Sequence, residues 1–216
     1  MKTKLLAIII GGCVGLGMVL VLGFYHVKVD LFPHISLVMP ESYKEYCDKG
    51  FLSDTTCNVY MDDQIYGQND YLRLFYLLDN ATKDTKITFH LSGYGGDAAS
   101  MITLGNHIRA SEAEVTMNVE GPVYSAHANL ALCGDKLKVV GTVFLMFHDV
   151  QYDPSRGQDA QLVAFLALAH NFMHEIGDGI ITPEQFDYMF SDMGAQLYLD
   201  GALVQKLFNA KHGIID

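Results

Sequence analysis

The chain has 216 residues, of which 50% are hydrophobic and 18% are charged. This composition is typical of a folded globular protein and excludes a largely disordered chain. The net charge is −11 with histidine neutral, and no run of lysine and arginine occurs, so nucleic acid is not expected as a partner. No cluster of histidine and cysteine has zinc-ligand spacing, and we therefore expect no metal site.

The N-terminal segment carries no charge from Leu5 to Phe24. As a helix it would span about 30 Å, the thickness of the hydrocarbon core of a bilayer. Lys2 and Lys4 precede it, which favours a cytoplasmic N-terminus and a translocated remainder. Residues 1–24 are therefore interpreted as a single-pass transmembrane anchor, with the main domain outside the cytoplasm. A cleaved signal peptide is the alternative, although its apolar region is normally shorter, roughly 7–15 residues.

Residues 25–56 have a mixed composition and are interpreted as a connector or a peripheral segment. Cys47 and Cys57 flank a polar loop, and they could form a disulfide if the domain is exported. Cys13 and Cys133 lie in apolar segments, where buried free thiols are common.

From Cys57 the pattern becomes regular, with strands, turns and helices following one another. We expect strands at 57–61, 87–91, 115–119, 137–140 and 143–147, and helices at 69–80, 101–108, 126–133, 157–176, 183–188 and 201–208. A glycine-rich turn follows the second of these strands, and the sequence GPVYS is expected to turn after the third. This succession predicts an α/β domain over 57–216.

Two strand-to-helix junctions carry candidate catalytic groups. Gly95 and Gly96 let backbone N–H groups approach a ligand without a Cβ, and such amides at a helix N-terminus suit an oxyanion. Ser125 begins the next helix, but a serine becomes a nucleophile at neutral pH only beside a base. His127 would point to a different side of that helix, and we expect it to pack or to meet solvent. His148 follows an apolar strand and is the better candidate for the base. Taken singly, these features are more typical of a tight turn, an N-cap serine and a strand-end histidine than of a catalytic site.

The order of these motifs resembles that of the ClpP-type serine peptidases of the ClpP/crotonase superfamily. Residues 92–97, SGYGGD, are similar to the family's Ser-Pro-Gly-Gly turn, but are one residue longer and lack the proline. Residues 121–128, GPVYSAHA, are similar to the nucleophile motif Gly-x-Ala-Ala-Ser-Met-Gly-Ala, and Met146–His148 is similar to the family's Met-x-His. Further short likenesses at both ends extend the resemblance over residues 57–216.

The resemblance implies a ClpP/crotonase-type spiral of strand-turn-helix units, here preceded by one transmembrane helix. It also implies a serine endopeptidase that cleaves peptide bonds through an acyl-enzyme intermediate and requires no cofactor. By transfer, Ser125 attacks the substrate and His148 moves the proton. The amides of Gly95 or Gly96 and of Ala126 would then form the oxyanion hole.

The third member of the triad is not matched clearly. The family's aspartate precedes a Phe-Leu-Ser-Ala segment that resembles residues 198–201, and counting back from there reaches Gln196. An ungapped count from the helix at 183–188 instead reaches Met193, beside Asp192. We choose Asp192 as the acid; Gln196, Asp200, Asp149 and Asp153 are the remaining candidates.

The resemblance also implies a homo-oligomer that acts on peptide or protein substrates, with an AAA+ unfoldase as partner only if the domain faces the cytoplasm. Three further functions remain open. A crotonase-type acyl-CoA enzyme would share the oxyanion architecture, but no basic site for a CoA phosphate is apparent. The altered glycine turn and the unmatched acid favour a catalytically inactive scaffold or interaction module. A host-interaction or membrane-complex protein that borrowed the fold is the third.

Overall fold

A computed structural model describes residues 43–47, 56–153, 155 and 159–214 of the chain. The anchor expected at 1–24 and most of the connector expected at 25–56 lie outside these residues. Within the part of the chain that the structure describes, no helix is both long and apolar enough to cross a bilayer. Cys13 likewise lies outside the described residues, whereas Cys133 is a buried free thiol.

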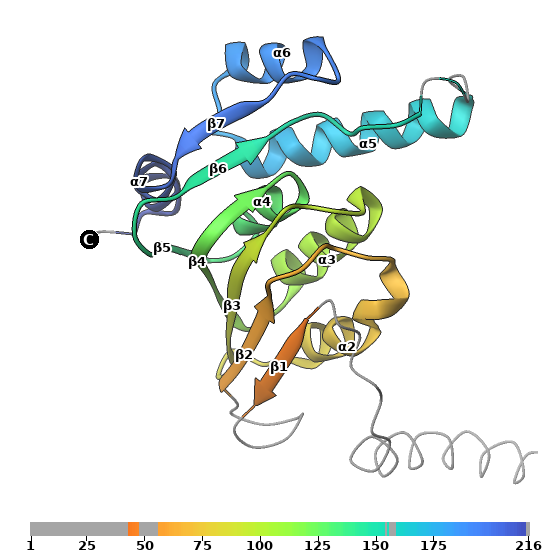
Figure 1. The fold of residues 1–216 in the computed structure, drawn as a ribbon. Coiled ribbons are helices and arrows are strands. Elements are labelled where there is room, and N and C mark those ends of the chain that lie inside the picture. The colour runs from red at the N-terminus through yellow and green to blue at the C-terminus, as the bar shows by residue number, and fades with distance from the viewer. Residues whose placement is uncertain (1–42, 48–55, 154, 156–158, 215–216) are drawn as a thin grey trace, which may run out of the picture. The chain divides into compact units, whose positions relative to one another are not determined.

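The described residues form one seven-stranded sheet with helices packed against it (Figure 1). The strands are β1 (Lys44–Cys47), β2 (Thr56–Met61), β3 (Lys86–Gly93), β4 (Glu114–Tyr124), β5 (Lys136–Val139), β6 (Phe144–Phe147) and β7 (Leu197–Asp200). The helices are η1 (Gln68–Tyr71), α2 (Leu72–Asn80), α3 (Ala98–Ala110), α4 (Ala126–Ala131), α5 (Ala160–Gly177), α6 (Pro183–Ser191) and α7 (Gly201–His212). The mixed α/β class expected from the sequence is confirmed.

The sheet order is β1-β2-β3-β4-β6-β7, with β5 also paired to β4. Strands β2 to β6 pair in parallel, while the edge strands β1 and β7 pair antiparallel to their neighbours. Strand β1 lies inside the segment expected as a connector. Its Cys47 pairs in register with Cys57 of β2, and a disulfide joins the two residues, whose Cα atoms are 4.2 Å apart.

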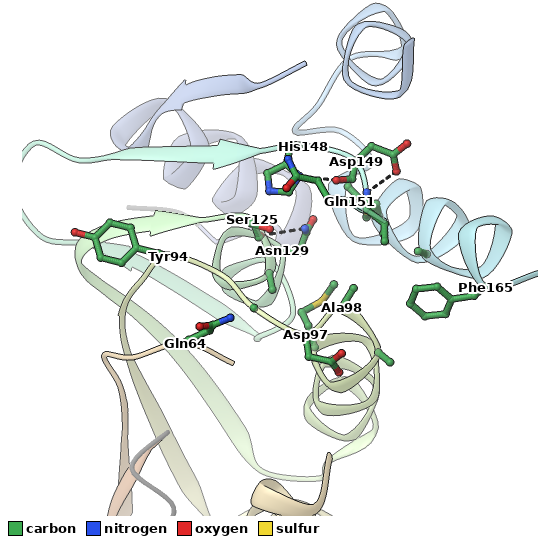
Figure 2. Close-up of a pocket in the computed structure, with 17 residues that line it drawn as sticks. Gln64, Tyr94, Asp97, Ala98, Ser125, Asn129, His148, Asp149, Gln151 and Phe165 are labelled. Atoms are coloured by element: carbon green, nitrogen blue, oxygen red, sulfur yellow. Dashed lines mark hydrogen bonds between the residues drawn. The ribbon is translucent and has the colours of Figure 1, made fainter. Parts of the chain in front are cut away.

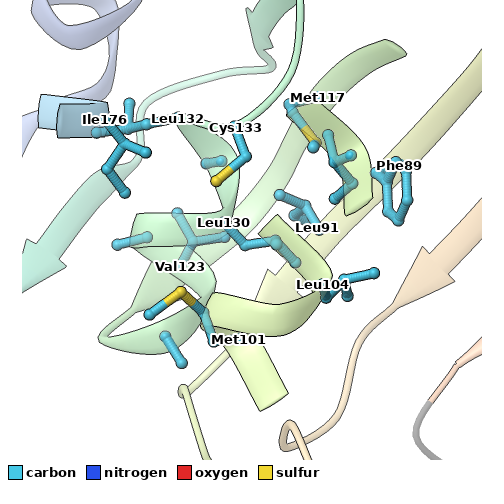
Figure 3. Close-up of a cluster of buried hydrophobic side chains, with 14 of the residues drawn as sticks. Phe89, Leu91, Met101, Leu104, Met117, Val123, Leu130, Leu132, Cys133 and Ile176 are labelled. Carbon is cyan, nitrogen blue, oxygen red and sulfur yellow. The ribbon is translucent and has the colours of Figure 1, made fainter. Parts of the chain in front are cut away.

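The main core lies between the central strands and the helices α2 to α5 (Figure 1). Apolar residues alternate with polar ones along β3 and β4, so one face of each strand is buried. Phe89 and Met117 from these strands and Leu104 of α3 are fully buried, and Leu130 of α4 closes the same cluster (Figure 3). This packing fixes α3 and α4, and with them the two junctions that precede these helices.

Strand β4 is longer than the sequence suggested, since the predicted turn at 121–125 is strand as far as Tyr124. The pairing of Val123 with Gly93 on one side and Leu145 on the other satisfies the backbone there. A register shift between Leu91 and Gly93 accommodates the extension. The turn is thereby delayed to Ser125 itself.

This topology brings the sequence motifs to one edge of the sheet. Parallel strands end at the same edge, and β4 lies between β3 and β6. The glycine turn follows β3, Ser125 follows β4 and His148 follows β6. Three segments that are distant in sequence therefore meet at the carboxyl ends of adjacent strands.

Candidate active site

Ser125 occupies a strained turn between β4 and α4. Its φ of 56° and ψ of −120° make it the one non-glycine residue with positive φ among the described residues. Such a conformation is unfavourable for an L-residue, and a strained strand-to-helix turn is how some hydrolases expose a nucleophile. The Ser125 N–H donates to the Met146 carbonyl at 2.6 Å. The Ser125 carbonyl accepts from both nitrogens of Asn129, each at 3.1 Å.

The Ser125 hydroxyl does not cap the helix that it precedes. No N-cap hydrogen bond from its side chain to α4 is present, in contrast to Asp97, whose carboxylate caps α3 through the Ser100 N–H at 2.7 Å. The N-cap interpretation of Ser125 therefore does not account for its position. Its backbone is fixed on both sides, and its side chain lines a cavity of about 410 Å³.

The glycine turn packs against Ser125 and is held by hydrogen bonds to Ile65. Ile65 donates its N–H to the Gly95 carbonyl and accepts from the Asp97 N–H, both at 2.8 Å. Gly95 and Gly96 have φ values of 105° and 141°. A Cβ on Gly95 would lie 2.7 Å from the Cβ of Ser125, and one on Gly96 would lie 2.1 Å from the Ile65 carbonyl oxygen. Only glycine fits at both positions.

The two glycine amides differ in their partners. The Gly95 N–H donates to His127 Nδ1 at 3.1 Å inside the protein, so it is not directed at the cavity. The Gly96 N–H has no hydrogen-bond partner among the described residues, and Gly96 lines the same cavity as Ser125. The Ala126 N–H, at the first position of α4, cannot bond within its own helix. Among the residues that line this cavity, Gly96 and Ala126 therefore have N–H groups that a ligand could accept from.

His127 is fully buried, which agrees with the expectation that it packs rather than serves Ser125. Burial lowers the pKa of His127 to about 4, so the ring is neutral at physiological pH. Its contact with the glycine turn was not anticipated from the sequence, because it depends on how α4 lies against the end of β3.

His148 lies at the end of β6 and lines the same cavity as Ser125 (Figure 2). Its Nδ1 is 2.5 Å from the carbonyl oxygen of Asp149. A carbonyl only accepts, so Nδ1 carries a proton, and in the neutral form of the ring Nε2 then has the lone pair. Among the described residues no hydrogen bond joins His148 to the Ser125 hydroxyl.

Asp149 is the buried carboxylate next to this histidine, and its side chain turns away from the His148 ring. Its Oδ1 accepts from the Val150 N–H at 2.6 Å and contacts His170 Nε2 at 2.7 Å. His170 lies on α5 and stacks on Phe190, with ring centroids 4.1 Å apart. In the sequence Asp149 is one of several candidate acids, and His170 has no distinguishing setting there. Only the packing of α5 beside β6 reveals the pair.

The structure does not bring Asp192 into contact with His148. Asp192 is exposed at the end of α6, and its Oδ1 accepts from the Gly194 N–H at 3.1 Å. Three more of the candidates for the third triad member also have local partners. Gln196 accepts from the Tyr198 hydroxyl at 2.8 Å, Asp200 caps α7 through Leu203, and Asp153 accepts from Ser155.

The cavity itself is mixed in character. Ser125 and His148 line it together with further polar residues, among them Asp97 and Asn129, and apolar side chains of α3 and α5 also contribute: Met101, Phe165, Ala169 and Met173. Tyr94, 79% exposed, is another of the lining residues. This arrangement can receive an apolar side chain beside a carbonyl group held near Ser125.

Comparison with known proteins identifies the fold. No protein family and no curated protein is matched by the sequence at a significant level. Among solved structures, the ClpP protease catalytic domain from Plasmodium falciparum is similar, with a TM-score of 0.50 and 18% sequence identity. The match covers 73% of this chain and 81% of that chain. The chain has a ClpP-like fold. At this level of identity the likeness extends to the architecture and no further.

Proposed function

We propose that the chain is a serine peptidase that cleaves peptide bonds through an acyl-enzyme intermediate on Ser125. The observation that carries this proposal is the strained, uncapped Ser125 at a cavity that it shares with His148. A ClpP-like fold with these two residues at the ends of adjacent parallel strands supports the peptidase over other uses of the fold.

The proposed reaction uses groups on three sides of the cavity. His148 Nε2 takes the hydroxyl proton while Ser125 Oγ attacks the peptide carbonyl carbon. The N–H groups of Gly96 and Ala126 stabilise the negative oxygen that forms. The imidazolium then gives its proton to the leaving amine, and a water molecule activated by His148 hydrolyses the ester. Such contacts often tighten only when substrate binds, so the direct Ser125–His148 hydrogen bond belongs to the substrate complex.

In this proposal the Asp149 carbonyl orients the imidazole, because it accepts the Nδ1 proton. A carbonyl stabilises the imidazolium less than a carboxylate does, and a modest rate follows. Asp192, chosen from the sequence, is retained as the second candidate for the orienting group. Its carboxylate would have to displace the Asp149 carbonyl from Nδ1, and substitution of Asp192 by asparagine decides between the two.

We further propose a homo-oligomer that acts on peptide or protein substrates. The first half of α5 supports this, because residues 160–168 carry no charge, and Val163 and Leu168 are 50% and 54% exposed. Exposed uncharged helices of this kind are typical of protein interfaces. A membrane anchor, a location outside the cytoplasm and an AAA+ unfoldase as partner rest on the sequence alone and remain proposals.

A fluorophosphonate probe tests the proposed chemistry directly. We expect the full-length protein to be labelled, Ser125→Ala to lose all labelling, and Ser191→Ala to be labelled like the wild type. Ser191 is a matched control, since it is exposed and its hydroxyl donates to the Tyr188 carbonyl of its own helix. Absence of labelling in folded wild-type protein would contradict the peptidase.

A non-catalytic interaction module is the second candidate function. Two observations favour it: the Ser125 hydroxyl has no hydrogen bond to His148, and the Gly95 amide is already occupied by His127. The labelling experiment separates the two functions, because a module with an unactivated serine gives no more labelling than Ser125→Ala.

A further inference from the structure

His127 is an unusual residue to find in the interior beside a candidate nucleophile. It lies on α4 two positions after Ser125 and is 0% exposed. A Cβ on Gly93 would come within 2.6 Å of both Cε1 and Nε2 of the ring, so the glycine makes room for the imidazole. The ring is therefore built into the space between the end of β3 and α4.

The polar atoms of this ring are not equally satisfied. Nδ1 accepts from the Gly95 N–H at 3.1 Å, which places the ring proton on Nε2. Nε2 is buried and has no hydrogen-bond partner among the described residues. An unsatisfied buried N–H destabilises the folded state, and an apolar side chain of similar size would avoid that cost. What the imidazole provides and an apolar side chain lacks is the acceptor for Gly95.

That acceptor holds the glycine turn at a second point, in addition to the bonds to Ile65. The Gly95 carbonyl accepts from Ile65, and the Gly95 N–H is held by His127. In the parallel bridge between Ile65 and Gly96, the bonds to Ile65 come from the neighbours of Gly96. The Gly96 N–H therefore points away from Ile65, and Gly96 lines the cavity with Ser125.

We propose that His127 is a positioning residue, whose neutral ring holds the Gly95 amide and thereby directs the Gly96 N–H into the Ser125 cavity. Without the acceptor, the Gly95 N–H becomes a buried unsatisfied donor, and the turn relaxes toward other conformations that its two glycines permit. The structural part of this inference concerns the turn alone. Its catalytic consequence rests on the proposed function.

Two substitutions separate the acceptor from the volume of the side chain. His127→Asn keeps an acceptor, because Oδ1 of asparagine lies close to the position of Nδ1. His127→Leu keeps a similar volume and has no acceptor. The first measurement is hydrogen exchange of the Gly95 amide in the full-length protein, and the second is the rate of fluorophosphonate labelling of Ser125.

We expect His127→Leu to lose protection of the Gly95 amide and to be labelled about 10²-fold more slowly, the typical effect of losing one oxyanion donor. His127→Asn is expected to retain most of the protection and most of the rate. Unchanged Gly95 exchange in His127→Leu, or equal losses in the two variants with both folded, would overturn the proposal.

Two further arms keep the experiment decisive. If the leucine variant does not fold, ¹⁵N spectra of histidine-labelled wild-type protein report the tautomer, and a protonated Nδ1 on neutral His127 overturns the proposal. If wild-type protein is not labelled while Gly95 exchange still depends on residue 127, the peptidase fails and the positioning role stands. The two failures are therefore distinguishable.

Discussion

The two sides of the Ser125 cavity are held in different ways. On the glycine-turn side, Gly95 is bonded through its carbonyl to Ile65 and through its amide to the buried His127. On the β6 side, His148 is half-buried, and the partner of its ring is the carbonyl of the next residue. The glycine-turn side is held by hydrogen bonds from two other segments of the chain, whereas the position of His148 depends on one short loop after β6.

This difference indicates which part of the site is preformed. Oxyanion donors are most effective when they need no reorganisation, and a clamped glycine turn meets that condition. A general base has to approach the hydroxyl and then the leaving group, so some freedom at His148 is compatible with its role. In the proposed mechanism the two histidines near Ser125 therefore have different roles: His127 fixes the glycine turn and His148 transfers protons.

Replacing the proposed base gives the largest expected effect. His148→Ala removes the only proton acceptor proposed for Ser125, and we expect peptide hydrolysis to fall at least about 10³-fold, as when triad members are removed from serine peptidases. His127→Asn is the matched comparison within the same site and is expected to retain more activity. Steady-state hydrolysis of a fluorogenic peptide measures both. Equal losses of activity in the two variants would contradict the proposal that His148 and His127 have different roles.

Acid pH is expected to weaken the glycine-turn side through His127. Burial lowers the pKa of His127 to about 4, against about 6.5 in the unfolded chain. Between these two pH values the unfolded chain binds more protons than the folded protein, so the free energy of unfolding rises with pH. The stability that depends on neutral His127 is fully present above pH 6.5 and is lost as the pH falls through 4. It amounts to about 3 kcal/mol at most. Asp63 opposes the shift, since its charge raises the pKa of His127.

Urea unfolding at pH 4.5 and pH 7.5 measures this contribution. We expect His127→Leu to lose part of the difference between the two pH values that the wild type shows. His212→Gln is the control, because His212 also has a pKa lowered by burial but lies on α7. If the leucine variant keeps the full difference while the His212 variant loses it, the acid sensitivity originates outside the site.

The sequence was sufficient to predict strands β2 to β6, the helices and the position of the motifs at strand ends, whereas the edge strands β1 and β7 were not predicted. Short apolar runs, several of them with period two, predicted these strands, and their parallel pairing in the structure gathers the residues that directly follow them at one sheet edge. Ser125 and His148 could be found because they directly follow β4 and β6. The residues next to them in the sequence were therefore enough to single them out.

The partners of these residues could not be predicted, because they come from packing. His170 reaches Asp149 across a separation of 21 residues and only through the placement of α5. The orientation of His148 by a backbone carbonyl has no side-chain signature in any sequence. The extension of β4 to Tyr124 depends on pairing with both neighbouring strands, whereas the local sequence GPVYS favoured a turn.

The Asp149–His170 pair provides a test of intermediate size on the β6 side. His170→Phe removes the partner of Asp149 and loosens the loop that carries His148, and we expect kcat to fall about 10-fold with little change in KM, since small misplacements of a catalytic group cost up to about 10²-fold. His174→Gln is the matched control on the same helix, because His174 packs on Phe186 and edge-on against Phe190 but has no hydrogen bond to Asp149 among the described residues. A loss in both variants would point to α5 as a whole.

The smallest effect is expected at Asp192, and it decides how the imidazole is oriented. Among the described residues the Asp192 carboxylate accepts only from the Gly194 N–H, a bond that an asparagine oxygen also makes. Asp192→Asn is therefore expected to change kcat/KM less than about 2-fold, as for an ordinary surface position. Asp187→Asn on the exposed face of α6 is the matched control.

If Asp192 were the triad acid, Asp192→Asn would lower kcat about 10⁴-fold through the wrong imidazole tautomer. A loss of that size, with Asp187→Asn unaffected, would transfer the orienting role from the Asp149 carbonyl to Asp192, and the β6 side would then be rebuilt on substrate binding.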